Sequence, residues 1–149
     1  MKTQFAYPKA ILLGVASLLS FACTAQKTNI TIAELPSPAQ TFIKNNFPNQ
    51  ATSYIIRDVD VRETEYELKF TGGAEIEFDA KGNWKEVDAN RSTMPQSVLP
   101  KAIADYNAAN YKGLAVEKIE KKHWGYKLEF TNDVELEFDN TGKFLRVDD

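Results

Sequence analysis

The sequence predicts an α+β fold: two tandem helix-plus-four-stranded antiparallel meander repeats that form one sheet layer with both helices on its apolar face. Two observations predict it. Residues 66–88 and 126–148 match at a constant offset of 60, with 11 of 23 positions identical, which indicates two copies of one structural unit. Ahead of each copy, apolar residues at helical spacing give way to alternating apolar and polar residues. Since the matching positions are apolar and turn residues, the repeat predicts a scaffold and leaves the activity open.

Residues 1–25 are predicted to be a secretory signal peptide. Two lysines precede an apolar run, and small residues precede a cut before Gln26. Cys23 leaves a lipid-anchored form open as an alternative, but Ser20 and Phe21 depart from the usual lipobox, so simple cleavage is favoured. We therefore expect an exported protein, periplasmic or secreted.

The composition of the remaining chain excludes several classes of partner. It carries 16 basic and 21 acidic residues, a net charge of −5, which argues against nucleic acid and anionic membrane surfaces. No second apolar run is long enough to span a bilayer, so no transmembrane segment is expected. With one histidine and no cysteine left to pair, we expect no metal site, no cofactor and no disulfide.

The mature chain divides into four segments. Residues 26–33 are a polar leader, either a tether or a first edge strand. Repeat 1 is assigned to residues 34–88, a linker to 89–96, and repeat 2 to 97–149. One helix on four strands buries little apolar area alone, so the two repeats are expected to share one core.

The predicted helices begin after a Leu-Pro pair, at residues 35–36 and 99–100. In the first helix Ser37 is the expected N-cap, and Gln40 is placed to reach back to it. Gly113 is expected to close the second helix.

The loop at residues 71–73 sets the predicted strand register. Three loop residues place Phe70 opposite Ala74, so that apolar side chains face one another. The same register gives each repeat one opposed and one like-charged pair on its wet face. The expected pairs are Lys69–Glu75, Glu67–Glu77, Lys127–Glu137 and Glu129–Glu135.

Asp79 and Asp139 each begin a turn with glycine three residues later. Glycine supplies the left-handed conformation that such a turn needs, and the carboxylate can accept from the turn's own amides. The acids that a calcium loop requires before its glycine are missing, so turn capping is favoured over calcium binding.

The chain resembles the PepSY-like family, whose fold is similar to that of the β-lactamase inhibitor protein. The motif E-I-E-F-D-x-x-G-x-W at residues 75–84 carries the resemblance, and a variant of it recurs at 135–144. The resemblance covers residues 34–149 and implies tandem helix-plus-sheet repeats in an exported, Bacteroidetes-type protein. PepSY domains proper are named for peptidase propeptides, which makes hydrolase inhibition a hypothesis. The disulfides of the inhibitor protein have no counterpart here.

The predicted function is a non-catalytic binding module that contacts a protein, such as a hydrolase it restrains, through its sheet face and hairpin tips. The alternative is a binder of a small ligand or cell-envelope component, held between the sheet and the helices. We expect no enzyme, because the sequence has no G-x-S-x-G motif and one histidine. Trp84 and Trp124 are expected in the core, and Leu145 is expected to be exposed. The candidate partner-binding residues are Glu75, Glu77, Glu135, Glu137, Lys69, Lys127, His123 and Leu145.

Overall fold

The computed structural model of the chain describes residues 26–148. The predicted signal peptide, including Cys23, lies outside the described residues. In chain order the elements are β1 (Gln26–Asn29), the 3-10 helix η1 (Ile32–Glu34), α1 (Ser37–Asn46), β2 (Thr52–Val59), β3 (Thr64–Phe70), β4 (Glu75–Phe78), β5 (Trp84–Asp88), the 3-10 helix η2 (Gln96–Val98), α2 (Lys101–Asn110), β6 (Val116–Lys122), β7 (Gly125–Phe130), β8 (Glu135–Asp139) and β9 (Phe144–Asp148).

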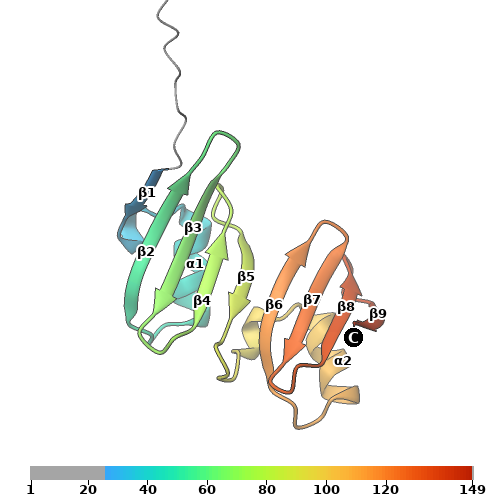
Figure 1. The fold of residues 1–149 in the computed structure, drawn as a ribbon. Helices are drawn as coiled ribbons and strands as arrows, with labels where there is room; N and C mark the ends of the chain where they lie inside the picture. The colour runs from blue at the N-terminus through green and yellow to red at the C-terminus, as the bar shows by residue number, and fades with distance from the viewer. Residues whose placement is uncertain (1–25, 149) are drawn as a thin grey trace, which may run out of the picture.

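These strands form a nine-stranded antiparallel sheet in which every strand pairs with its sequence neighbours. Both α-helices lie behind this sheet, so one face is covered by helices and the other is not (Figure 1). The predicted α+β fold of two helix-plus-meander repeats in one layer is confirmed. The pairing of β5 with β6 joins the repeats edge to edge. The one strand beyond the eight predicted is β1, which lies in the leader and forms an edge of the sheet.

The first strand of each repeat pairs with a strand outside that repeat. In repeat 2, β6 pairs with β5 of repeat 1, and in repeat 1, β2 pairs with β1 of the leader. On β6, Ile119 lies opposite Val87 of β5. Ile55 holds the matching place on β2, and its carbonyl accepts from the amide of Ile30, just beyond β1, at 3.0 Å. Ile30 packs against the core there. The leader therefore does for β2 what β5 does for β6.

Matching aromatic contacts attach each helix to the sheet. Phe42 on α1 meets Phe78 edge-on, with ring centroids 6.0 Å apart, and Tyr106 on α2 meets Phe138 at 5.4 Å. Phe78 and Phe138 are fully buried, as the alternation predicted. Full burial of such a ring stabilises the fold by roughly 2–3 kcal/mol.

The predicted turns and register are confirmed. The amide of Phe70 donates to the Ala74 carbonyl at 2.9 Å across the three-residue loop. Asp79 Oδ1 accepts from the amides of Lys81 and Asn83, each at 2.9 Å, and Asp139 does the same in repeat 2. Burial works against ionisation of Asp79, but these hydrogen bonds outweigh it and lower its pKa.

Two sequence predictions need correction. Ser37 is not the N-cap: α1 already includes it, Pro36 is the cap residue, and its carbonyl accepts from the amides of Ala39 and Gln40. The Gln40 side chain does reach back, but it donates to the Leu35 carbonyl at 2.8 Å. Because that carbonyl lies before the cap residue Pro36, the side chain satisfies a group that the helix itself does not use.

The second correction concerns the two tryptophans, which were both expected in the core. Trp84 packs against the core beside Phe42 and Tyr126, as expected. Trp124 is half-buried in the turn between β6 and β7 and is not among the described residues that pack on the core. The prediction of a core position for Trp124 was wrong because the strand alternation that placed it stops at Gly125, where β7 begins.

Candidate functional site: the uncovered face of the sheet

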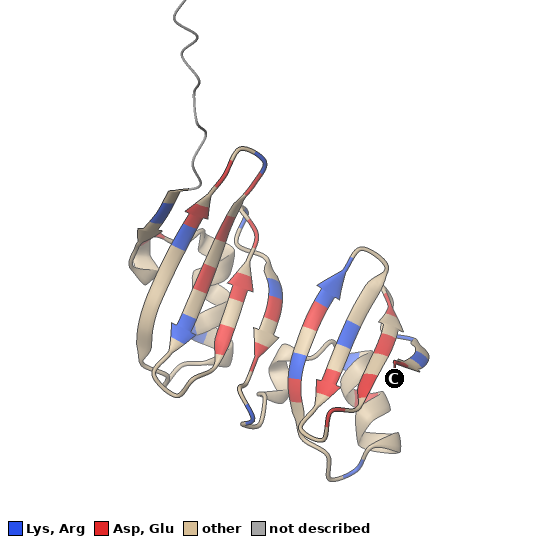
Figure 2. Ribbon diagram, in the orientation of Figure 1, with Lys and Arg blue, Asp and Glu red and all other residues tan. Residues whose placement is uncertain are grey.

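Charged side chains concentrate on the sheet face opposite the helices, which we call the uncovered face. Figure 2 shows that face toward the viewer, with acidic residues gathered on the central strands and basic residues between them. Side chains alternate along a strand, so the buried apolar set on the covered face leaves the charged set on this one.

Four glutamates from successive strands lie side by side across this face. Glu67 of β3 is opposite Glu77 of β4, which is opposite Glu86 of β5, which is opposite Glu120 of β6. We call these four residues the acidic row. With neighbouring strands about 4.8 Å apart, it extends about 14 Å and crosses the junction between the repeats.

The centre of the acidic row is the pair Glu86 and Glu120. Lys118 Nζ lies 2.7 Å from Glu86 and 3.7 Å from Glu120, and Lys122 Nζ lies 2.8 Å from Glu120. Burial, and then the hydrogen bond with Glu120, raise the pKa of Glu86 to about 7. Burial also disfavours the ionised form of Glu120, but the bonds from Glu86 and Lys122 outweigh it and lower its pKa. The pair therefore shares one proton up to near-neutral pH.

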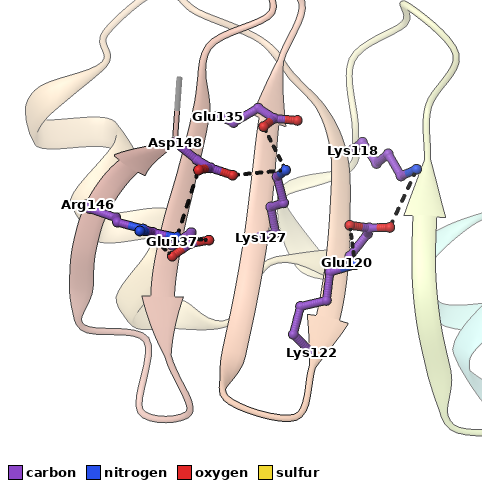
Figure 3. A network of polar contacts seen from close by, with 8 residues as sticks. All are labelled: Lys118, Glu120, Lys122, Lys127, Glu135, Glu137, Arg146 and Asp148. Atoms are coloured by element: carbon purple, nitrogen blue, oxygen red, sulfur yellow. Dashed lines mark hydrogen bonds and ion pairs between the residues drawn. The ribbon is translucent and has the colours of Figure 1, made fainter.

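Repeat 2 continues the row with alternating charge (Figure 3). Lys127 lies opposite Glu137, as predicted, but its Nζ pairs with Glu135 at 2.7 Å and Asp148 at 3.1 Å. Glu137 instead accepts two hydrogen bonds from the guanidinium of Arg146, at 2.7 and 3.0 Å. The hydrogen bond to Glu135 raises the pKa of Lys127. At the ladder positions that continue the row, opposite charges thus lie next to one another in repeat 2, where repeat 1 has acids side by side.

The structure separates the predicted site residues. Glu75 pairs with Lys69, as the register predicted. Glu77 is exposed and forms no ion pair with any described residue, whereas Glu137 is only 9% exposed beneath Arg146. His123 is exposed at the tip between β6 and β7, away from the strand positions of the row.

Leu145 is exposed, as predicted, with 49% of its surface accessible. The ladder explains its position. Phe138 pairs with Phe144 and Glu137 with Arg146, so Leu145 is the extra residue of a β-bulge on the edge strand β9.

The uncovered face is shallow. A hollow among Lys118, Glu120, Lys127, Glu129 and Glu135 has a volume of about 70 Å³. A second hollow beside Asp58, Glu67 and Glu77 has about 170 Å³. Both are smaller than the roughly 300–1,000 Å³ of typical small-molecule sites, so this face suits a protein surface better than a small ligand.

The described residues contain neither a metal-binding cluster nor a membrane-spanning helix. Among residues 26–148, no three histidine, cysteine or acidic side chains are grouped to hold a metal ion. None of the described helices is long and apolar enough to cross a membrane.

The fold and the face define a class: a tandem helix-plus-sheet scaffold with one bare, charged sheet surface. The chain belongs to the PepSY-like family, since the family model described as "Putative beta-lactamase-inhibitor-like, PepSY-like" matches residues 22–71 and 64–146. None of the curated proteins matches the chain.

Solved structures from Bacteroides species share this fold. One from Bacteroides thetaiotaomicron, described as "a putative calcium-regulated periplasmic protein", is 34% identical with a TM-score of 0.78, covering 83% of this chain and 97% of that one. A Bacteroides vulgatus protein of the DUF2874 family, described as "a putative periplasmic protein", is 35% identical with a TM-score of 0.77 and the same coverage. Another from that organism, described as of unknown function, is 34% identical with a TM-score of 0.77, covering 83% and 100%. The periplasmic descriptions support an exported location for this chain.

Proposed function

We propose that this chain is an exported, non-catalytic module that binds another protein on the uncovered face of its sheet, with a restrained hydrolase as one form of partner. The observation that carries the proposal is the acidic row: four glutamates on successive strands, at the centre of a face that no helix covers.

The acidic row has an energetic cost that a basic partner would remove. Like charges directly opposite one another destabilise a sheet by roughly 0.2–1 kcal/mol per pair. Three such contacts follow one another here. Lys118 and Lys122 pair with Glu86 and Glu120, whereas Glu67 and Glu77 form no ion pair with any described residue. A partner that presents Lys or Arg side chains at similar spacing would supply the missing counter-charge and gain orientation from it.

The test is affinity capture from a cell-envelope extract with residues 26–149 as bait. The bait is compared with a Glu67→Gln, Glu77→Gln, Glu120→Gln variant, which keeps side-chain shape and removes charge from the row. A matched control removes three exposed charges elsewhere: Glu63→Gln, Asp105→Asn and Asp133→Asn. The expected result is one reproducible protein, released by salt, bound about tenfold more weakly by the row variant and normally by the control. Recovery of no reproducible protein, or equal loss in both variants, would reject the proposal.

Calcium is a natural competitor in this assay, because one structural neighbour is described as calcium-regulated. A cation that settles on the acidic row would weaken capture by the unchanged bait and leave the row variant unaffected. Capture that is equally sensitive to calcium in both baits would place the calcium effect on the partner.

A second candidate function, the binding of a small ligand between sheet and helix, is favoured by one observation. A pocket beside α2 contains a buried amide with no hydrogen-bond partner among the described residues. The two candidate functions use opposite faces of the sheet and can be tested separately.

A further inference from the structure

A pocket of about 280 Å³ lies where the end of α2, the loop that follows it and the start of β6 meet. Its wall combines apolar side chains with two amides and one ammonium group. The lining residues are Gln96, Ala104, Asn107, Ala108, Tyr111, Lys112, Gly113, Leu114 and Val116.

Asn107 is the unusual member of this wall. It is 8% exposed, and neither its Nδ2 nor its Oδ1 has a hydrogen-bond partner among the described residues. Two other helical asparagines are satisfied: Asn46 donates to the Phe42 carbonyl and Asn110 to the Tyr106 carbonyl, both at 2.9 Å. Buried polar groups are almost always paired, so an orphaned amide needs an explanation.

Repeat 1 shows that the fold does not need a polar residue here. Ile43 of α1 holds the place that Asn107 holds on α2, 64 residues later, and it is 6% exposed. Both lie one turn before the aromatic residue that follows their helix, Phe47 in repeat 1 and Tyr111 in repeat 2. An apolar residue fits the helix–sheet contact, so the amide is retained in repeat 2 at a cost in stability.

We propose that this pocket binds the C-terminal end of a short peptide, with Asn107 as its recognition residue. The inference rests on the second candidate function and names its ligand class. An asparagine amide offers one acceptor and two donor hydrogens side by side. An extended peptide residue presents its N–H and C=O on the same side, which matches that pattern. Both amide atoms are covered in the free protein, so the proposed contact requires the Asn107 side chain to turn toward the pocket.

The rest of the wall fits the same ligand. The Tyr111 ring, Leu114 and Val116 offer an apolar surface for one side chain, and Leu114 is 38% exposed, which is high for a leucine. Lys112 is the one charged residue of the described lining, and its ammonium suits a terminal carboxylate. A volume of about 280 Å³ suits a ligand of one or two residues rather than a long peptide.

The probe is N-acetyl-leucine, which carries an amide, an isobutyl group and a carboxylate. Its titration is followed by the NMR signals of the Asn107 side-chain amide and of the backbone amides of Gly113 and Leu114, which line the same pocket and remain in every variant. The matched probe 4-methylpentanoate has the same carboxylate and apolar group without the amide. We expect saturable shifts with N-acetyl-leucine and binding about tenfold weaker for 4-methylpentanoate, the equivalent of one lost hydrogen bond. No saturation up to about 10 mM, or equal binding of both probes, would overturn the inference.

Asn107→Ile installs the residue of repeat 1 and separates a binding role from a structural one. We expect this variant to fold, to have a higher Tm than the unchanged chain, and to lose probe binding. Asn107→Ala serves as a second variant if isoleucine prevents folding, and Asn110→Ala on the same helix is the control that keeps binding. A lower Tm with unchanged binding in Asn107→Ile would assign Asn107 to the core and sink the inference.

The proposed protein-binding function and the peptide-binding pocket can be contradicted independently. The triple variant of the acidic row retains N-acetyl-leucine binding, and Asn107→Ile retains protein capture. Loss of probe binding in the row variant would contradict the assignment of the ligand to this pocket.

Discussion

Glu86 and Glu120 lie directly opposite each other across β5 and β6, the strand pair that joins the two repeats. The charged groups around Glu86 are Glu77 on β4, and Lys118 and Glu120 on β6. The shared proton of the pair makes this junction sensitive to pH.

The first prediction is that stability falls as the pH rises from about 5 to about 8. The pKa of Glu86 is raised from 4.5 to about 7, so the folded protein holds its proton more tightly than the unfolded chain. The stabilisation is full below pH 4.5 and is lost as the pH rises through about 7. Since part of the side chain reaches solvent, we expect a loss of about 1–2 kcal/mol in the free energy of unfolding. The lowered pKa of Glu120 acts below 4.5, outside this range.

The variant Glu86→Gln tests whether Glu86 causes this pH dependence of stability. The amide keeps the shape of the protonated acid, so denaturant unfolding of this variant should depend little on pH between about 5 and 8. Glu63→Gln, at an exposed hairpin acid, should retain the full pH dependence of the unchanged chain. An unaltered pH dependence in Glu86→Gln would contradict the prediction.

The second prediction concerns the β4–β5 turn. Gly82 has φ +83°, and a Cβ there would lie 2.8 Å from Pro36 Cβ at the start of α1. Gly82→Ala therefore combines a left-handed alanine with a clash against the helix, and we expect it to lower the free energy of unfolding by about 2–4 kcal/mol.

Gly113→Ala is the matched control for this substitution. Gly113 has φ +84°, and a Cβ there would have no neighbour within 4 Å. Only the conformational cost applies, so a loss of about 1 kcal/mol is expected in denaturant unfolding. Equal losses at the two glycines would show that the turn does not press on α1.

Within each repeat, the sequence was sufficient to predict the fold. The matching motifs predicted the hairpins, because loop length and apolar alternation leave one register that buries Phe70 and Leu68. The capped turns at Asp79 and Asp139 followed from local chemistry that needs no tertiary information.

Contacts between repeats could not be predicted in the same way. Val87 and Val147 occupy the same motif position, yet Val87 is fully buried and Val147 is 43% exposed, because β5 is internal and β9 is an edge strand. Of the acidic row, the sequence predicted the contact of Glu67 with Glu77, but the contact that crosses between the repeats was missed for the same reason. Glu86 meets Glu120 only through the β5–β6 pairing, which no turn between adjacent strands specifies. The Asn107 pocket had one sequence signal, a polar residue at the position of Ile43.

The third prediction is that the leader stabilises repeat 1 selectively. Ile30 is half-buried against the core where β5 would lie in repeat 2. Ile30→Ala should lower the free energy of unfolding by about 1 kcal/mol, less than for a fully buried isoleucine. Amide hydrogen exchange should accelerate in β2 and remain unchanged in β7 and β8. Val61→Ala, at a side chain that is 72% exposed, should alter neither measurement. Equal acceleration across both repeats would mean that the leader acts on the whole sheet.

The last prediction concerns the ladder pair Glu137 and Arg146, on strands β8 and β9 beyond the acidic row. In repeat 1 the same ladder position holds two acids, Glu77 and Glu86, and Glu77 is exposed. In repeat 2 the side chain of Glu137 is 11% exposed and depends on two hydrogen bonds from Arg146. Arg146→Ala leaves a covered carboxylate with neither bond, so the Tm should fall.

A double variant separates the lost bonds from the exposed charge. Glu137→Leu combined with Arg146→Ala removes the stranded carboxylate as well, and should recover most of the Tm lost in Arg146→Ala, since an apolar side chain has no bond to lose. Arg62→Ala, at an exposed arginine of the β2–β3 hairpin, should leave the Tm unchanged. An unchanged Tm in Arg146→Ala, as in Arg62→Ala, would contradict the prediction and show that the stability of the fold does not depend on the bonds from Arg146 to Glu137.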